Sequence, residues 1–273
     1  MTKLPLIVQP TGGLCNRMRT IAAAAELASI LGCRMCVIWT RDVSLNARFD
    51  SLFQPLPFPV VEFRLGSFLQ RLLWHFCRYI LRYRVFDDAW IYANARGKDL
   101  SLWRGDMERQ PVYICASCDI FKDGGDYSMF RLAEALKPRT LSNPDDVVGI
   151  HIRRTDNVKS VRYSPTSLFT EKIAEVLSEN PAVRFYLATD DATEETTLQQ
   201  RFPGKIIIYK KESLDRNSPV AIRDAVIDLY NLAHCGKIYG SFWSSFSDIA
   251  ALWGGIEKEV LKTDGAGMQI SSS

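Results

Sequence analysis

The chain has 273 residues, of which 47% are hydrophobic and 24% charged, proportions that are ordinary for a globular protein with a substantial buried core. Its formal net charge of +3 is too small to indicate a nucleic-acid partner. No apolar run approaches the length of a transmembrane helix, so a soluble or at most peripheral protein is expected.

The seven cysteines favour a reducing, cytoplasmic location. Their number is odd, several lie in predicted strands or helices, and residues 1–9 do not resemble a signal peptide. Two pairs, Cys33 with Cys36 and Cys115 with Cys118, have the spacing of zinc ligands. Each pair lies in or beside a predicted strand, however, and not on a knuckle loop, so buried free thiols are the better interpretation and no metal site is expected.

The first elements form a predicted βαβ unit. A strand over residues 4–9 is followed by a turn containing Gly12 and Gly13, a helix that ends near Leu31, and a strand over residues 34–39. Glycines at such a turn let backbone N–H groups approach a ligand at the helix N-terminus. The motif GxGxxG is absent and no acidic residue ends the second strand, so a tight turn without a ligand is an alternative.

Residues 64–84 predict one amphipathic helix whose charged residues are all arginines. A basic amphipathic helix can lie on an anionic membrane surface, here the inner face of the membrane, or near a lipid-linked acceptor. More often such a helix covers a sheet and keeps its arginines in water, which is the interpretation we favour. The other elements of this half are a strand over residues 111–116 and a proline-containing linker over residues 137–146.

The domain boundary is predicted at that linker. Residues 1–145 are expected to form one α/β domain and residues 146–264 a second, followed by a disordered tail over residues 265–273.

The second half begins with a β-branched run over residues 147–152, which predicts a buried strand. The strand is followed by Arg153, Arg154, Thr155 and Asp156. The carboxyl ends of strands in an open α/β sheet face the ligand crevice, and a guanidinium fork suits a phosphate better than it suits a core. The alternative is one arginine in a structural ion pair and the other in solvent.

Strands and helices then alternate regularly, which predicts a doubly wound α/β domain. We expect Ser164 to cap the first of these helices. The predicted elements are a helix over residues 165–179, a strand over 184–189, a helix over 193–202, a strand over 205–209, a helix over 220–234, a short strand over 237–240 and a helix over 244–253.

Polar residues at the ends of these strands should meet at one crevice. Hydroxyls and free N–H groups at a helix start, beside two arginines, describe a diphosphate site. For the serines, helix capping is the alternative. Asp228 falls among apolar neighbours in its helix, so it needs a specific partner, either an arginine or the N–H groups of a guanine edge. The polar set at the other strand ends is Asp190, Asp191, Ser241, Ser244, Ser245 and Ser247.

Four sequence runs resemble the superfamily that contains the α1,6-fucosyltransferases, the Nod-factor fucosyltransferases and the protein O-fucosyltransferases, and point to a bacterial member. They are HIRRTD at residues 151–156, YLATDD at 186–191, the run from Asn217 to Leu252, and GGLCNRMR at 12–19. The resemblance covers most of residues 147–252 and one motif near the start.

The resemblance implies an α/β fold of GT-B type, with two Rossmann-like doubly wound domains that face a cleft. The second domain would bind GDP-fucose without a metal ion, and residues 1–145 would form the acceptor side. The implied catalytic group is Arg153, which would neutralise the β-phosphate, supported by Arg154 and Asp156. The implied donor-binding residues are His151, Asp190, Asp191, Asp228, Ser244, Ser245 and Ser247, and the implied cleft loop contains Gly12, Gly13, Asn16 and Arg17.

Two departures from the family pattern leave the catalytic base unassigned. Asn157 stands where the family usually has a lysine, although Lys159 is near, and Val161 stands close to where some members have a glutamate. Valine cannot accept a proton, and Asp42, Asp87 and Asp88 are only guesses for that role.

The hypothesis from sequence is therefore an inverting, metal-independent transfer of fucose from GDP-fucose to a hydroxyl of a glycan, in bacterial glycan biosynthesis. The alternatives are a transferase for another nucleotide sugar and a binding module that has lost catalysis. A Rossmann oxidoreductase is disfavoured because the dinucleotide fingerprint is missing.

Overall fold

The computed structural model describes residues 5–63, 67–95, 110–118, 120, 125–142, 146–155, 157–213 and 218–264. The chain divides into two compact units: unit 1 comprises Met1–Lys137 and Asp215–Arg223, and unit 2 comprises Pro138–Leu214 and Asp224–Ser273. The predicted tail over residues 265–273 and the predicted site residue Asp156 lie outside the described residues.

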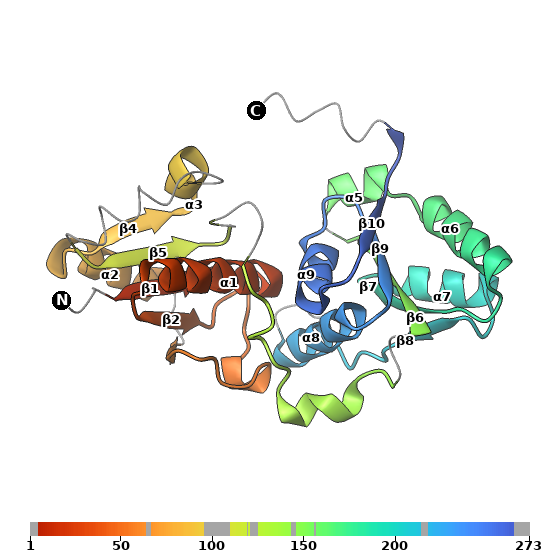
Figure 1. Cartoon of the computed structure of the whole chain (residues 1–273), viewed down its shortest axis with the longest axis horizontal. Coiled ribbons are helices and arrows are strands. Elements are labelled where there is room, and N and C mark those ends of the chain that lie inside the picture. Colours follow the sequence, from red (N-terminus) through yellow and green to blue (C-terminus); the bar gives the residue numbers. More distant parts are fainter. Residues whose placement is uncertain are drawn as a thin grey trace. The chain divides into compact units, whose positions relative to one another are not determined.

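Unit 1 contains a parallel sheet in the strand order β3-β2-β1-β5-β4 (Figure 1). The chain order of strands does not match their spatial order, and the order reverses between β1 and β5. Its elements are β1 Leu6–Pro10, α1 Leu14–Leu31, β2 Met35–Thr40, the 3-10 turn η1 Phe49–Ser51, β3 Val60–Phe63, α2 Ser67–His75, the π-helical turn η2 Phe76–Ile80, β4 Arg84–Asp87, α3 Asp88–Trp90, the π-helical turn η3 Ile91–Ala95, β5 Val112–Ala116 and the 3-10 turn η4 Glu134–Arg139.

The predicted βαβ unit at the start is confirmed. β1 and β2 pair in parallel, and α1 connects them and ends at Gly32, which adopts the left-handed conformation with φ 61°. Its small residues Ala22, Ala23 and Ala24 are fully buried, which lets the helix lie close to its neighbours.

The prediction of a single helix over residues 64–84 is wrong in its length. The described part is helical only to Ile80, and Arg82 then takes a left-handed φ of 54°. The chain turns into β4, where Arg84–Asp87 pairs with β5. Strand pairing overrides the helical pattern here because it satisfies the backbone groups and buries Phe86 completely.

The helical part exposes most of its apolar side chains in the described structure. Phe68, Leu72 and Tyr79 are each more than half exposed. An apolar hollow of about 580 Å³ is lined by Phe63, Leu69, Leu72, His75, Phe76, Tyr79 and Ile80. Within the described residues, no helix has the length and apolar composition that crossing a bilayer requires.

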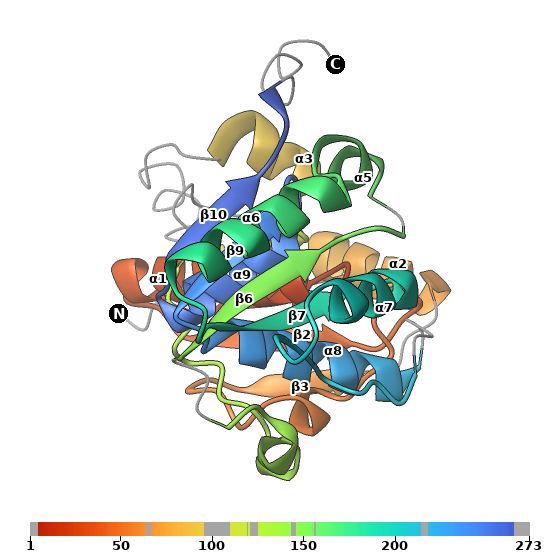
Figure 2. The same ribbon diagram turned by 90° about the vertical axis from the view of Figure 1, so that its right-hand side faces the viewer.

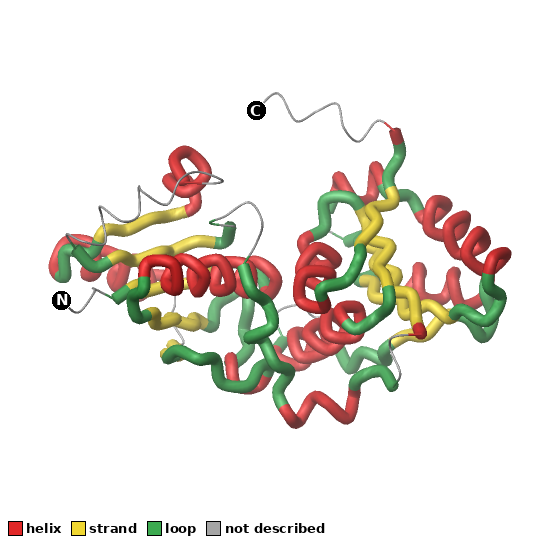
Figure 3. The backbone as a smooth tube through the Cα atoms, in the orientation of Figure 1, coloured by secondary structure: helices red, strands yellow, loops and turns green. Residues whose placement is uncertain are grey.

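Unit 2 contains a second parallel sheet in the order β10-β9-β6-β7-β8, with β6 at its centre. Helices α6 and α7 cover one face and helices α8 and α9 the other, which makes the unit doubly wound (Figures 1 and 2). Figure 3 shows the same layering, with the strands in yellow and helices in red on either side. Its elements are β6 Val147–Ile152, α5 Val158–Tyr163, α6 Thr166–Glu179, β7 Arg184–Thr189, α7 Ala192–Arg201, β8 Ile206–Ile208, α8 Pro219–Ala233, β9 Lys237–Ser241, α9 Ser245–Gly254 and β10 Lys258–Leu261. The first residues of α8, up to Arg223, are assigned to unit 1, and the helix belongs to unit 2 from Asp224 onward.

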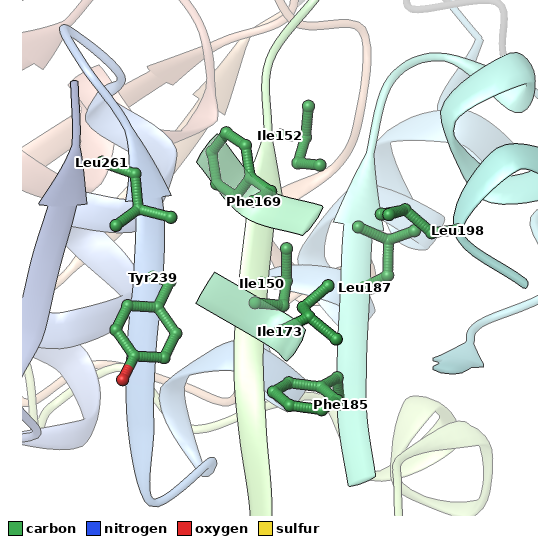
Figure 4. Packing of buried hydrophobic residues seen from close by; sticks show 9 residues of the cluster. All are labelled: Ile150, Ile152, Phe169, Ile173, Phe185, Leu187, Leu198, Tyr239 and Leu261. Carbon is green, nitrogen blue, oxygen red and sulfur yellow. The ribbon is translucent and has the colours of Figure 1, made fainter. Parts of the chain in front are cut away.

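The core of unit 2 lies between this sheet and the helices α6 and α7. Ile150 and Ile152 from β6 meet Phe169 and Ile173 from α6, and all four side chains are fully buried (Figure 4). On the opposite face Gly149 leaves room for α8, because a Cβ atom there would lie 3.0 Å from Cδ2 of Leu232. The central strand is thus buried on both faces, as its continuous β-branched pattern predicted.

Ser164 does not cap the helix that follows it, contrary to the prediction. The N-cap residue of α6 is Pro165, and the Ser164 side chain is fully buried. Its hydroxyl donates to the carbonyl of Leu261 at 2.5 Å and accepts from the N–H of Phe242 at 2.8 Å. The hydroxyl is therefore hydrogen-bonded to β10 and to the segment after β9, and not to the N-terminus of α6.

Candidate functional site

The candidate site lies at the carboxyl ends of β6 and β9, where the strand order of unit 2 reverses. β6 pairs with β7 on one side and with β9 on the other, so this is the switch point at which open α/β sheets bind ligands. The Arg153 N–H donates to Oγ of Ser241 at 3.1 Å, and that hydroxyl donates to the carbonyl of His151 at 3.3 Å. The two strand ends are therefore joined directly beneath the arginine pair.

Asp190, at the end of β7, holds the loop that carries the arginines. Its carboxylate accepts from the N–H of Arg154 at 2.8 Å, from Oγ1 of Thr155 at 2.6 Å, and pairs with Nη1 of Arg153 at 3.1 Å. Burial alone would raise the pKa of Asp190, but the bond from Thr155 and the charge of Arg153 outweigh it and hold the pKa below its ordinary value. Asp190 is therefore ionised at neutral pH and fixes the loop.

The two adjacent arginines have different surroundings. Arg154 is 11% exposed, and its guanidinium binds Oε1 of Glu194 at 2.6 Å and Oγ1 of Thr166 at 3.1 Å. Its remaining amino group donates to the carbonyl of Arg153 at 3.0 Å. Arg153 is 25% exposed and keeps its guanidinium at the edge of the sheet. Arg154 thus forms the structural ion pair that the alternative interpretation allowed for one arginine.

His151 is buried on the opposite face of β6 from the aliphatic core. Its ring stacks on Phe246 of α9, with centroids 5.0 Å apart and an interplanar angle of 21°. Burial, and then the charge of Arg153, lower the pKa of His151 to about 3, so the imidazole is neutral at physiological pH. Its Nδ1 atom is buried without a hydrogen-bond partner in the described part of the chain.

Asp228 belongs to a buried polar network under the same sheet. Its carboxylate accepts from the hydroxyl of Tyr186 at 2.5 Å and pairs with Nζ of Lys211 at 3.3 Å. Lys211 also binds Glu195 at 2.8 Å, and Asn231 donates to the Tyr186 hydroxyl at 3.0 Å. The partner of this carboxylate is therefore a lysine and a tyrosine, where the sequence suggested an arginine or a guanine edge.

The pKa of Asp228 provides a test of this network. Burial raises it from 3.8 to about 6, although Lys211 and Tyr186 act in the opposite direction. A carboxyl whose pKa is raised on folding stabilises the protein fully below its unfolded pKa, and that contribution is lost as the pH rises through the folded pKa. We therefore expect the unfolding free energy of the wild type, relative to Asp228→Asn, to fall between pH values of about 4 and 6. Urea unfolding of both proteins across this range measures the difference, and a difference independent of pH would contradict the assignment.

The serines near α9 divide into buried and accessible side chains. Ser247 is fully buried, and a Cβ atom on Gly240 would lie 2.6 Å from its hydroxyl, so we assign it to packing α9 on β9 and not to a phosphate. Ser244 occupies the N-cap position but is 5% exposed and makes no side-chain cap bond. Ser245, the first helical residue, is half-buried and lies among the free N–H groups of the helix start. Asp191 caps α7 by accepting from the N–H of Thr193 at 2.8 Å.

In unit 1 the glycine turn lies at the corresponding switch point, between β1 and β5. Gly12 has φ +75°, and a Cβ atom there would lie 3.2 Å from Nδ2 of Asn16 and 3.5 Å from Cβ of Ser117. Gly13 is the N-cap residue of α1, and a Cβ atom there would meet open space. The turn therefore brings backbone N–H groups and the half-buried Asn16 to one edge of the sheet.

Arg17 is not available to a ligand in this arrangement. Its side chain is fully buried, donates to the carbonyl of Gly12 at 2.8 Å and to that of Thr40, and pairs with Asp42 at 3.0 Å. Burial lowers the pKa of Arg17, and Asp42 opposes the shift. Arg17 supports the glycine turn from beneath and does not face a cleft.

The acidic residues considered as a base are all engaged. Asp42 pairs with Arg17, Asp87 caps α3 through the N–H of Trp90 at 2.9 Å, and Asp88 accepts from the hydroxyl of Ser117 at 2.9 Å. The seven cysteines are free thiols, but of the two pairs predicted to be buried only Cys118 is buried, and Cys33, Cys36 and Cys115 are partly buried. Among the described residues, no group of three or more His, Cys, Asp or Glu side chains could hold a metal ion.

Sequence patterns did not identify the residues that hold the predicted site residues in place. Thr166 and Glu194 lie 12 and 40 positions from Arg154 along the chain, and they reach it only in the fold. Lys211 likewise lies 17 positions from Asp228. The sequence offered one signal, because a buried charged side chain needs a partner. That requirement indicates that a partner exists but not which residue supplies it.

No family model matches the chain, and no curated protein matches it in sequence. Solved structures match it in fold. NodZ α-1,6-fucosyltransferase soaked with GDP-fucose has a TM-score of 0.58 at 17% identity, over 92% of each chain. Arabidopsis thaliana FUT1, a mutant in complex with GDP, has a TM-score of 0.61 at 13% identity, over 96% of this chain and 70% of that one. POFUT1 in complex with GDP-fucose has a TM-score of 0.52 at 11% identity, over 96% and 98%. These matches confirm the predicted α/β fold with two Rossmann-like units.

Proposed function

We propose that this chain, which has the fold of the fucosyltransferases, is a glycosyltransferase that binds GDP-fucose at the carboxyl edge of the second sheet. It transfers fucose to a hydroxyl group of a glycan with inversion at the anomeric carbon. The observation that carries the proposal is the placement of Arg153 at the switch point, with its side chain 25% exposed and held by Asp190 and Ser241. The solved relatives in fold that carry GDP or GDP-fucose in their names support the choice of donor.

The chemical difficulty of this reaction is the charge that builds on the departing diphosphate. We assign its neutralisation to the guanidinium of Arg153 and to the free N–H groups at the start of α9, near Ser245. These donors are fixed before the reaction begins, so they stabilise the developing charge without reorganising. In this proposal no divalent cation takes part.

The other residues predicted for the site have supporting roles in the proposal. We assign Arg154 and Asp190 to holding the loop of Arg153. We keep the neutral His151 ring, whose Nδ1 has no hydrogen-bond partner among the described residues, beside the nucleotide. Asp228 is 4% exposed, and its carboxylate already accepts from Tyr186 and pairs with Lys211. We therefore assign it a structural role beneath the nucleotide. Its contact with guanine stays a prediction. We assign the glycine turn and Asn16 of unit 1 to the acceptor side of the site.

Thermal unfolding in the presence of nucleotides tests the donor. We expect GDP at millimolar concentration to raise the unfolding midpoint, and UDP, CMP and NAD to leave it unchanged, because only a ligand of the native state stabilises it. At 100 times Kd the stabilisation is about 2.7 kcal/mol. The shift should persist in excess EDTA. A shift by NAD or UDP in place of GDP would contradict the proposal.

Hydrolysis of the donor separates an enzyme from a binding module. A transferase should release GDP slowly from GDP-fucose in the absence of acceptor, and GDP-mannose serves as the matched donor that differs in its sugar. GDP binding without any hydrolysis would favour the non-catalytic alternative. Faster hydrolysis of GDP-mannose would favour another donor sugar.

The location of the protein is also part of the proposal. The seven free thiols are typical of a reducing compartment, which favours the cytoplasm. The contact of the predicted basic helix over residues 64–84 with a membrane surface stays a prediction, and binding to phosphatidylglycerol liposomes at low salt measures it.

A further inference from the structure

Trp243 adopts a backbone conformation that tryptophan rarely takes. It follows β9 by two residues and has φ +58°, in the left-handed region that favours glycine. Its side chain is nevertheless 56% exposed, so packing into the core does not explain the conformation. For a bulky residue, such a backbone is maintained only where the surrounding structure enforces it, and it points to a functional role.

The surrounding structure enforces it through α5 and the residues on either side of that helix. Asn157 donates to the carbonyl of Trp243 at 2.7 Å, and Ser160 donates to the carbonyl of Phe242 at 2.6 Å. The N–H of Phe242 donates to the buried hydroxyl of Ser164 at 2.8 Å. Three side chains thus hold the backbone of two consecutive residues, Phe242 and Trp243, while the Trp243 side chain stays more than half exposed.

The indole lies at the edge of the sheet that carries the candidate phosphate site. Ser241, two residues earlier, holds the N–H of Arg153, and Ser245, two residues later, begins α9. Nζ of Lys159 lies 4.0 Å from the centroid of the Trp243 ring on one side. The face of an indole carries partial negative charge, which attracts cations and also the C–H groups of a sugar ring.

We propose that Trp243 is the aromatic platform on which the sugar ring of the nucleotide sugar stacks. The inference rests on the proposed function and adds the residue that recognises the pyranose. A ring attached to the β-phosphate must lie just beyond the groups that hold the diphosphate, and Trp243 is the exposed aromatic residue on that same loop of unit 2. Asn157, Ser160 and Ser164 are positioning residues that set the angle of the indole.

The test compares the dissociation constants of GDP-fucose and GDP, measured by isothermal titration calorimetry on the full chain at low temperature. Trp243→Gly removes the indole and accepts the left-handed φ without strain, so the loop keeps its conformation. Trp243→Phe keeps an aromatic face. We expect the glycine variant to bind GDP-fucose roughly three- to tenfold more weakly, the size of one aromatic contact, while its affinity for GDP is unchanged. The phenylalanine variant should keep most of the affinity for GDP-fucose.

Each other outcome overturns the inference. Unchanged affinity for GDP-fucose in the glycine variant would show that the indole does not contact the sugar. Equal losses for GDP and GDP-fucose would assign Trp243 to the phosphate loop. If the wild-type protein bound neither ligand, the proposed function would fail and this inference with it. If the wild type bound both ligands and the variants bound them equally well, only this inference would fail.

Discussion

Replacement of Arg153 by lysine should lower the rate of fucosyl transfer about 10²–10³-fold, the usual cost of losing one preorganised donor to the developing charge. Lysine keeps the positive charge but loses the planar fork, so it cannot reproduce the two-point contact with a phosphate. Arg153→Ala should lose at least as much. Hydrolysis of GDP-fucose without acceptor should fall in parallel, because the same leaving group departs in both reactions.

A matched control is available in the same unit. Arg162 is an exposed arginine on α5 whose guanidinium lies over the ring of Tyr163, a residue that has no part in the proposed mechanism. Arg162→Lys should transfer fucose at the wild-type rate. Both lysine variants should unfold at the wild-type temperature, since Arg153 is partly exposed and its ion pair with Asp190 adds little. Near-full transfer by Arg153→Lys would remove Arg153 from the mechanism.

Replacement of Arg154 by methionine should lower stability instead, by roughly 3–5 kcal/mol, the cost typical of breaking a buried ion pair. Arg154 and Glu194 are 11% and 10% exposed, and one oxygen of Glu194 has no hydrogen-bond partner among the described residues. Without Arg154 the carboxylate of Glu194 would be buried with the hydroxyl of Thr166 as its one partner in the described part of the chain.

The double variant Arg154→Met with Glu194→Leu tests the cause of this loss. Removing both charges removes the uncompensated carboxylate, so most of the stability should return. The urea midpoint of the wild type, the single variant and the double variant measures the effect. A single variant as stable as the wild type would contradict the assignment of Arg154 to a structural pair. Equal losses in the single and the double variant would show that packing, and not charge, was the cause.

Secondary structure was most predictable for the longest helix and for the strands that are buried on both faces. The predicted bounds of β7 coincide with those of the structure, and β6 and α1 were correctly located. The strands β3, β4 and β10 were not predicted, because each has only four residues and lies at the edge of its sheet. Short edge strands take their stability from a neighbour that sequence alone does not identify.

The amino-acid sequence by itself determined the chemistry that is present: a buried strand ending in two arginines, carboxylates after the next strand, and a glycine turn at the start. Those features follow from local pattern, because hydrophobic period and turn composition act over a few residues. Only the tertiary structure decided that Arg153 lies partly exposed at the edge, paired with Asp190, that Arg154 is buried against Glu194, and that Arg17, Ser164 and Ser247 are buried. Burial and pairing depend on side chains far away in the chain, so the same residue type acquires opposite roles at neighbouring positions.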